Sequence, residues 1–428
     1  MRSSPKTSCG RPNKRPKSSP NNTDKRSTRS SRKRNRRSWK SEAQASVLAP
    51  SVPTTSTFLP TCVSVDLSAL AHNVAQFRKV LSPGCDVLAV IKANAYGHGS
   101  VQTAKALIRQ GVSRVAVVSI EEGVTLRQAG INAPIVILGP VFHEQFTDLF
   151  THQLTPVVSD AAILPALGQA ASSLPSPYPI HLKVETGMGR LGLTHAELVD
   201  LFSSRRFPHA LHLEGLMTHL ADADGPATDT TEEQLTRFRK AIEIVRASGF
   251  RVPLIHAANS AGAVRFPDAQ FSLVRPGIML YGYHTLPASI AAPDLKPVLT
   301  LRTTIAQLRT VQAGHKVSYN GTFTAKTPTK IAILPIGYAD GLSRHLSNRG
   351  SVLIRGQRAP IAGLVCMDMI MVDVTKIAGA SVGDEAVIIG RQGDEQITAD
   401  DIAKWTGTIA YEVLCTIGPR VPRLYHEG

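Results

Sequence analysis

The chain has 428 residues, and 48 Lys+Arg stand against 32 Asp+Glu, which gives a formal net charge of +16 at pH 7. Most of this charge lies in residues 1–50, which hold 15 basic and two acidic residues, whereas residues 51–428 hold 33 basic and 30 acidic residues. A nucleic-acid-binding domain carries its positive charge on folded surface, so the nearly neutral body argues against that class. The sequence contains no run of 18 or more apolar residues, which excludes a membrane-spanning helix.

The composition, 43% hydrophobic and 19% charged residues, is enough to bury a sizeable core. The length suits two or three domains, although one α/β barrel uses about 250 residues by itself. The cysteines are odd in number and never have the CxxC spacing, which is typical of a reducing compartment and predicts a cytoplasmic protein without disulfides or a metal site. These cysteines are Cys9, Cys62, Cys85, Cys366 and Cys415.

The first part of the chain, residues 1–41, consists mostly of Ser, Arg, Lys, Pro and Asn. Such a segment has little to bury and cannot offset its ordering entropy, so we predict a disordered basic leader over residues 1–55. A nucleic-acid arm, a nuclear-localisation-like patch, a transit peptide and a plain extension from an early start codon all stay open as its role. A secretory signal is disfavoured because no continuous apolar segment precedes the folded part.

A first strand is expected at residues 61–65, followed by a helix over residues 67–81. Eight short apolar runs then alternate with helical patterns such as residues 231–248, where apolar residues recur at spacings of three and four. This alternation predicts a parallel (β/α)8 TIM-like barrel over residues 56–295, with a doubly wound three-layer sheet as the alternative. The eight runs are residues 86–91, 114–120, 134–138, 154–158, 180–184, 211–217, 254–258 and 271–274.

The alternation of strands and helices ends at about residue 295. After it, strand-like segments follow one another with Gly and Pro turns between them. One helix is expected late, at residues 399–406. We therefore predict a separate, mostly β C-terminal domain over residues 296–428. Its expected strands are residues 299–311, 330–336, 351–354, 369–374 and 385–389.

In a (β/α)8 barrel the reactive residues follow the strands at their carboxyl ends. The first barrel run ends on Lys92, directly after buried positions and before a glycine-containing turn. Burial lowers the pKa of a lysine and makes its amine a better nucleophile for a Schiff base. The alternative on spacing alone is a structural lysine whose charged end reaches solvent.

The ends of the later runs carry further polar groups. Ser260 and the backbone of Gly277 and Ile278 follow the seventh and eighth runs, where such barrels usually bind phosphate. A lysine, a phosphate site and a partner for the pyridine nitrogen are typical of pyridoxal phosphate enzymes. That partner is expected to be Arg275, which can only donate a hydrogen bond and so keeps the ring nitrogen unprotonated. The other charged groups at this rim are Lys183, Arg190 and His219.

Several motifs in order resemble the alanine racemases over roughly residues 60–428. They are AVIKANAYGHG, KVETGMGRLG, MTHLA, HAANSAG, RPGIMLYG, KVSYNGTF, LPIGYADGL, CMDMIMVDV and the terminal RVPRLY. The resemblance implies a pyridoxal 5'-phosphate-dependent isomerase that interconverts L- and D-alanine and supplies D-alanine for peptidoglycan. It also implies a head-to-tail homodimer whose subunits share their active sites.

By this resemblance Lys92 carries the cofactor and is the base on one face of the substrate, and Tyr319 serves the opposite face. Racemisation needs two such groups, because the Cα proton leaves on one side and is returned on the other. The resemblance assigns further roles to twelve residues: Arg190 to the cofactor's phenolic oxygen and to substrate; Arg275 to the pyridine nitrogen, supported by His219; Tyr96, Ser260, Gly277, Ile278 and Tyr425 to the phosphate; Lys183 to a carbamylated position beside Arg190; and Tyr338, Met367 and Asp368 to the substrate entrance.

The sequence departs from the common family pattern at three positions. Asn320 stands where Gly is usual and is expected to alter the turn that carries the tyrosine. Leu364 replaces a frequent Arg, which removes a supporting contact, and Glu185 replaces a frequent Asp. Two other functions stay open, a racemase of serine, lysine or another amino acid and a non-catalytic pyridoxal phosphate carrier. The C-terminal domain and Tyr319 argue against the carrier.

Overall fold

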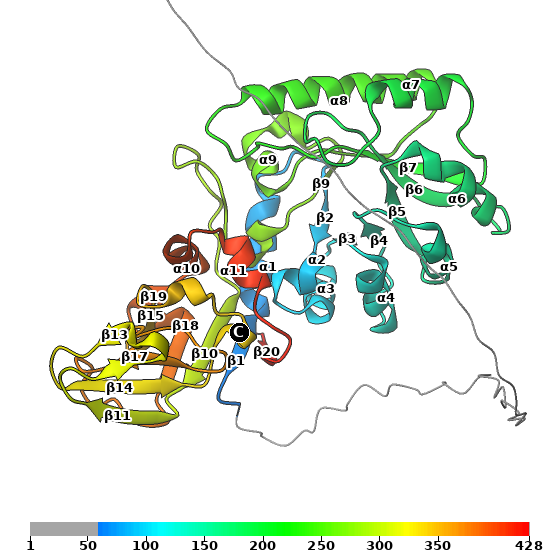
Figure 1. Ribbon diagram of the computed structural model, residues 1–428. Helices are drawn as coiled ribbons and strands as arrows, with labels where there is room; N and C mark the ends of the chain where they lie inside the picture. Colours follow the sequence, from blue (N-terminus) through cyan, green and yellow to red (C-terminus); the bar gives the residue numbers. More distant parts are fainter. Residues whose placement is uncertain (1–58, 428) are drawn as a thin grey trace, which may run out of the picture. The chain divides into compact units, whose positions relative to one another are not determined.

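The computed structural model describes residues 59–427, and the predicted basic leader lies outside that range (Figure 1). Eight parallel strands form one sheet in the order β8-β7-β6-β5-β4-β3-β2-β9. β9 pairs with β2, and the seam between β8 and β9 is held by a bridge between Asn259 and Arg275, so the predicted TIM-like barrel is confirmed as a nearly closed one. Its strands are β2 (Asp86–Val90), β3 (Arg114–Val117), β4 (Ile135–Ile137), β5 (Leu154–Val158), β6 (Tyr178–Lys183), β7 (Leu211–Met217), β8 (Leu254–His256) and β9 (Leu273–Val274).

Helices alternate with these strands, as the sequence predicts. The longest, α8, turns Leu235, Phe238, Ile242 and Val245 inward, so its apolar residues at helical spacing are buried. Within residues 59–427 no helix is both long enough and apolar enough to cross a membrane. The helices of the barrel region are α1 (Leu67–Arg78), α2 (Lys92–Tyr96), α3 (Ser100–Arg109), α4 (Ile120–Gln128), α5 (Phe146–Thr151), α6 (Leu164–Ala171), α7 (His195–Ser203), α8 (Asp229–Ala247) and α9 (Ser260–Arg265).

The mostly β C-terminal domain is also confirmed, and it contains three sheets. The largest has the order β16-β15-β18-β10-β1-β20, with β19 paired to β18; the others are β11-β14-β17 and β12-β13. The elements are β10 (Leu299–Thr304), β11 (Gln307–Val311), β12 (Lys316–Val317), β13 (Phe323–Thr324), β14 (Thr329–Leu334), β15 (Ser351–Ile354), β16 (Gln357–Pro360), β17 (Ile370–Asp373), β18 (Glu385–Gln392), β19 (Glu395–Ile397), α10 (Ala399–Thr406), α11 (Ala410–Cys415) and β20 (Arg423–His426).

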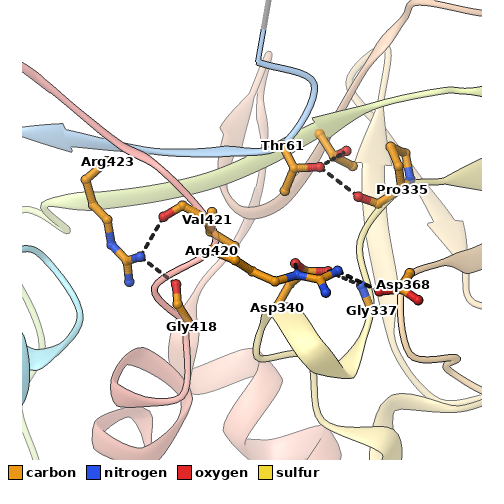
Figure 2. A network of polar contacts seen from close by, with 10 residues as sticks. Thr61, Pro335, Gly337, Asp340, Asp368, Gly418, Arg420, Val421 and Arg423 are labelled. Carbon is orange, nitrogen blue, oxygen red and sulfur yellow. Dashed lines mark hydrogen bonds and ion pairs between the residues drawn. The ribbon is translucent and has the colours of Figure 1, made fainter. Parts of the chain in front are cut away.

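The first strand, β1 (Cys62–Asp66), belongs to the largest sheet of the C-terminal domain although it precedes the barrel in sequence. Val63 pairs with Leu301 of β10 in an antiparallel ladder and with Arg423 of β20 in a parallel one. The Thr61 hydroxyl, which precedes β1, donates a hydrogen bond to the Pro335 carbonyl at 2.8 Å (Figure 2). The start of the folded chain, which the prediction assigned to the barrel, therefore pairs with strands that follow the predicted boundary at residues 295–296.

Several predicted strands differ from the structure by a few residues at their ends, and for two of them the structure shows the reason. The strand expected at residues 114–120 ends at Val117, because Ser119 caps α4 and forms a capping box with Glu122. The segment 299–311, expected to be one strand, is two: β10 pairs with β1 and β18, whereas β11 pairs with β14 in a different sheet. A continuous β pattern does not reveal the point at which a strand changes sheets.

Candidate active site

A cavity of about 550 Å³ opens where the barrel strands end. It brings together charged and polar groups that lie far apart in sequence, as expected for the carboxyl-terminal face of such a barrel. Nine of the predicted site residues line it: Lys92, Tyr96, Lys183, Arg190, His219, Ser260, Arg275, Gly277 and Ile278.

Lys92 is placed by a left-handed turn directly after β2. The four residues Ala93 to Tyr96 have φ values of 52°, 52°, 55° and 53°, and Gly97 closes the turn with φ 82°. Each non-glycine residue in this conformation costs roughly 1–2 kcal/mol. Contacts from elsewhere must therefore hold the turn, as is common for strained backbone at functional sites.

The Glu122 carboxylate supplies such a contact. It accepts hydrogen bonds from the Ala93 N–H at 2.6 Å and from the Val118 N–H at 2.8 Å. Because Glu122 lies in the first turn of α4, one side chain ties the turn after Lys92 to the end of β3. Sequence reasoning missed Glu122, because its contact with Ala93 joins residues that lie 29 positions apart.

The cavity disfavours positive charge on its two lysines. Burial lowers the pKa of Lys92, and the neighbouring Arg190 guanidinium lowers it further. Burial and the guanidinium groups of Arg190 and Arg275 lower the pKa of Lys183 to about 8. At neutral pH both lysines therefore have a larger fraction of neutral amine, which is the nucleophilic and basic form.

Arg275 is held rigidly among acceptors and is only 3% exposed. Its Nη1 donates to Nδ1 and to the carbonyl of His256, both at 3.0 Å, and its Nη2 donates to the Thr218 and Ala257 carbonyls at 2.7 and 2.9 Å. His219 Nδ1 lies 3.2 Å from the same Nη2, whose two N–H groups are shared among these three acceptors. Among the described residues the Nε–H makes no hydrogen bond, so it remains available to a group bound in the cavity.

Burial sets the charge states of Arg275 and His219. Burial lowers the pKa of Arg275 to about 9, which still leaves the guanidinium charged at neutral pH. Burial and the charge of Arg275 lower the pKa of His219 to about 3, so its imidazole is a neutral acceptor. The predicted support of Arg275 by His219 has the geometry it requires.

The same cavity also offers donors to an anion. The Gly277 N–H donates to Ser260 Oγ at 2.9 Å, which leaves the Ser260 hydroxyl hydrogen free to point elsewhere. Gly277 lies against Tyr96 Oη so closely that a β-carbon would not fit there. Burial raises the pKa of Tyr96 and keeps its hydroxyl protonated as a donor.

Two tyrosines near the C-terminus differ in position. Tyr411 of α11 lines the cavity and its ring lies 5.9 Å from that of Tyr96. Tyr425, which the sequence predicts at the phosphate, does not line the cavity, and its hydroxyl lies against Gly99. Sequence reasoning missed Tyr411, because one tyrosine in a short helical stretch carries no signal of its own.

Tyr319 lies apart from the Lys92 cavity. It is 68% exposed and borders a second hollow of about 640 Å³ in the C-terminal domain, together with Met367 and Asp368. The turn that carries it has φ 69° at Ser318 and φ 60° at Asn320, and the Ser318 hydroxyl donates to the Leu364 carbonyl at 2.8 Å. Asn tolerates this left-handed conformation, so the turn forms without the usual glycine.

The predicted entrance residues are braced by Arg420, as Figure 2 shows. Its Nε donates to Asp340 Oδ1 and its Nη2 to Asp368 Oδ1, both at 2.7 Å. Asp340 also accepts the Gly337 N–H at 2.8 Å, which fixes the turn of Tyr338. Asp368 therefore faces the hollow with its charge already paired.

The comparisons with known proteins agree with this architecture. The family model "Alanine racemase, N-terminal domain" matches residues 65–285, and "Alanine racemase, C-terminal domain" matches residues 298–425. An alanine racemase of Halothermothrix orenii is 43% identical over 366 residues, covering 86% of this chain and 97% of the relative.

The chain belongs to the alanine racemase family. An alanine racemase of Methanococcus maripaludis is 38% identical over 370 residues, covering 86% of this chain and 98% of the relative. The solved Bacillus anthracis alanine racemase with bound L-Ala-P superposes with a TM-score of 0.82 at 34% identity, over 87% of this chain and 97% of that one. A Bartonella henselae alanine racemase with covalently bound pyridoxal phosphate gives 0.78 at 29% identity, over 86% and 100%.

Alanine racemases are pyridoxal phosphate-dependent isomerases, so the predicted family, enzyme class and cofactor are confirmed. The residues of the cavity fit this cofactor on their own geometry. Lys92 offers a partly neutral amine, Arg275 a free Nε–H, and Ser260 and Tyr96 hydroxyl donors. A pyridoxal phosphate needs these three features, which are an amine for its aldehyde, a partner for its ring nitrogen and donors for its phosphate.

Proposed function

We propose that Lys92 and Tyr319 are the two acid–base groups with which this enzyme interconverts L- and D-alanine. The observation that carries the proposal is the burial of Lys92 beside Arg190, which lowers the lysine pKa. Pyridoxal phosphate, when bound, withdraws electrons from the substrate and makes its Cα hydrogen acidic. The Lys92 amine then takes or returns a proton at Cα on one face, and the Tyr319 hydroxyl does so on the other.

Arg275 sets the character of the site. Its guanidinium can donate but not accept, and its Nε–H is the donor left free toward the cavity. We propose that this N–H would donate to the pyridine nitrogen of bound cofactor and leave that nitrogen unprotonated, which would limit the withdrawal of electrons and the side reactions that it feeds. Ser260, Tyr96 and the backbone N–H of Ile278 hold the phosphate in this proposal; Gly277, whose N–H donates to Ser260 Oγ, and Tyr425 stay predictions.

The proposed site needs a second copy of the chain. Tyr319 does not line the Lys92 cavity of its own chain and leaves most of its surface exposed. In the proposed homodimer, Tyr319 of the partner subunit completes the cavity, and Tyr338, Met367 and Asp368 lie at the entrance. The entrance is narrow in this arrangement, which favours alanine over serine or lysine.

Lys183 is proposed to be carbamylated. With a pKa of about 8, part of its amine is neutral, and a neutral amine adds to carbon dioxide to give a carbamate with release of one proton. The carbamate would place a negative group beside Arg190, whose guanidinium is then oriented toward cofactor and substrate. The enzyme is further proposed to be cytoplasmic and to supply D-alanine for peptidoglycan.

The direct test is exchange of the alanine Cα hydrogen with deuterium from solvent, measured by NMR for each enantiomer separately. Both enantiomers are expected to exchange and to reach an equal mixture, and serine and lysine are expected to react much more slowly. A protein that binds the cofactor but exchanges neither enantiomer would instead be the carrier considered above. Faster exchange of serine or lysine would assign another amino acid as substrate.

A further inference from the structure

A row of buried side chains runs from Arg275 away from the cavity and through the barrel interior. Arg275 Nη1 lies 3.0 Å from His256 Nδ1, His256 Nε2 lies 3.0 Å from His181 Nδ1, and His181 Nε2 lies 3.2 Å from Glu214 Oε2. Both histidines are 0% exposed. Every nitrogen of the two rings therefore takes part in the row, and its far end is a carboxylate.

The two ends of the row fix the direction of every hydrogen bond in it. A guanidinium can only donate, so His256 Nδ1 is an acceptor and its proton lies on Nε2. His256 Nε2–H then donates to His181 Nδ1, and the proton of His181 lies on Nε2 and is donated to Glu214. An ionised carboxylate can only accept, so the row has a single consistent arrangement of protons.

The ionisation of the groups agrees with this arrangement. The hydrogen bond from His181 lowers the pKa of Glu214, so its carboxylate is ionised at neutral pH. Burial lowers the pKa of His181 and of His256, so both rings are neutral. Arg114 Nη1 lies 3.8 Å from Glu214 Oε1, within ion-pair distance, and stabilises the same charged form.

A register shift between β6 and β7 positions two members of this row. The ladder between β6 and β7 shifts register so that Ile180 pairs with Leu213 and His181 with Gly215, which leaves Glu214 as an extra residue. Such a bulge re-aims a side chain. Gly215 lies so close to the His181 ring that no β-carbon would fit, so the ring occupies space that only glycine leaves.

We propose that Glu214 is a positioning residue that acts through His181 and His256 to hold Arg275 in the orientation that presents its Nε–H to the cavity. The proposal rests on the proposed function, because it gives Arg275 its role at the pyridine nitrogen. Without the carboxylate, the His181 proton is free to move to Nδ1, which turns the His256 proton toward Arg275. Two donors would then face each other, and the guanidinium would have to rotate.

The test begins with the cofactor-free protein labelled with 15N-histidine, in which NMR distinguishes protonated from unprotonated ring nitrogens. We expect both His181 and His256 to be neutral at pH 7 with the proton on Nε2, assigned by single His→Gln variants. A charged ring, or a proton on Nδ1 of either ring, would overturn the proposal. This measurement needs no turnover, so it is independent of the proposed function.

Three variants separate positioning from folding. Glu214→Leu removes the acceptor and is expected to mix the tautomers of His181 and to lower kcat by about 10- to 100-fold with little change in KM for alanine. Glu214→Gln keeps an acceptor oxygen and is expected to retain the Nε2–H tautomers and kcat within about 3-fold. His212→Gln, on the exposed side of the same strand, is the control and should match the wild type.

The outcomes distinguish the two proposals. If the wild type racemises alanine but Glu214→Leu keeps its tautomers and its kcat, the positioning role is wrong and the proposed function stands. If the wild type has the expected tautomers but exchanges no alanine hydrogen, the proposed function is wrong and the row is structural only. A Glu214→Leu protein with lost tertiary structure is replaced by Glu214→Met, read by the same NMR experiment.

Discussion

The cavity around Lys92 and the surface around Tyr319 are built in opposite ways. In the barrel, Lys183 and Arg275 are 4% and 3% exposed, and burial shifts the pKa values of both. In the C-terminal domain, Tyr319 and Met367 are 68% and 53% exposed. One half of the proposed site is thus complete inside a chain, whereas the other half is presented outward.

The two proposed acid–base groups therefore obtain their surroundings in different ways. The barrel places Lys92 on a strained turn, and burial together with the nearby Arg190 guanidinium lowers the pKa of its amine. Tyr319 lies on a short turn held by Ser318 and Leu364, and its surroundings are proposed to form only on dimerisation.

Replacing Lys92 should have the largest effect. Lys92→Ala removes the proposed cofactor linkage and one of the two proposed acid–base groups, so racemisation should fall by more than about 10⁴-fold and the visible absorbance of the bound cofactor should disappear. Lys105→Ala, an exposed lysine on α3, is the matched control. A visible band that persisted in Lys92→Ala would assign the linkage to another lysine.

Tyr319→Phe should keep the cofactor and lose the chemistry of one face. Loss of a positioned acid or base typically lowers the rate by about 10²–10⁴-fold, and the visible absorbance should be unchanged. Exchange of the Cα hydrogen should fall more for the enantiomer that Tyr319 deprotonates. Near-normal turnover in steady-state assays of both directions would contradict the two-base mechanism.

Acid should destabilise the barrel through its buried histidines. Burial lowers the pKa of His98 to about 4 and that of His219 to about 3, so below pH 6.5 the unfolded chain binds protons that the folded protein does not. The contribution of each histidine to the free energy of unfolding is therefore fully present above pH 6.5. As the pH falls from 6.5 toward the folded-state pKa, the free energy of unfolding decreases by about 1.4 kcal/mol per pH unit for each histidine.

The measurement is denaturant unfolding of the cofactor-free protein at several pH values. His98 Nδ1 donates to the Ala95 and Tyr96 carbonyls, each at 2.9 Å, and His98→Asn keeps a donor there without titrating. Between pH 4 and 6.5 this variant should lose about 1.4 kcal/mol per pH unit less than the wild type. Equal slopes for the two proteins would mean that His98 is not buried as described.

Glu122→Ala should loosen the turn after Lys92. It leaves the N–H groups of Ala93 and Val118 without their acceptor, so the free energy of unfolding should fall by about 1–3 kcal/mol and cofactor affinity should weaken. Thermal unfolding and cofactor titration measure the two effects. Glu121→Ala, at the neighbouring exposed position, should change neither, and a similar loss in both variants would point to the helix cap instead.

Asn320 should give the smallest effect. Asn320→Gly is expected to change the free energy of unfolding by less than about 0.5 kcal/mol, because both residues adopt positive φ. Asn320→Val should cost about 1–2 kcal/mol and lower kcat by moving Tyr319. Thermal unfolding and steady-state kinetics measure the stability and kcat of the two variants. Equal stability and equal kcat would contradict the expectation and show that the turn accommodates either residue.

Much of the fold followed from the sequence, because buried parallel strands have a simple signature. The apolar runs before Lys92, Lys183 and His219 place these residues at one rim of the barrel, and the structure brings all three to one cavity. The strand over residues 299–311 was wrong in extent, because the pattern continues where the chain changes sheets. The pairing of β1 with β10 joins residues more than 230 positions apart and has no local signal.

The finer parts of the site could not be predicted for similar reasons. The left-handed turn from Ala93 to Tyr96 contains no glycine, so its conformation is imposed by contacts such as that of Glu122. The row from Arg275 to Glu214 depends on a register shift in β7, which a strand pattern does not reveal. Asn320, which is expected to alter the turn that carries Tyr319, has a φ of 60°, a value that asparagine tolerates.

In the proposed dimer, each site combines Lys92 of one chain with Tyr319 of the other, and complementation between two variants tests this arrangement. Lys92→Ala and Tyr319→Phe chains with different affinity tags are co-expressed, and the mixed dimer is purified through both tags. In that dimer one site has both intact residues and the other has neither, so the activity should be about half that of the wild type. If the two groups act within one chain, both sites carry a lesion, and the mixed dimer would be as inactive as either variant alone.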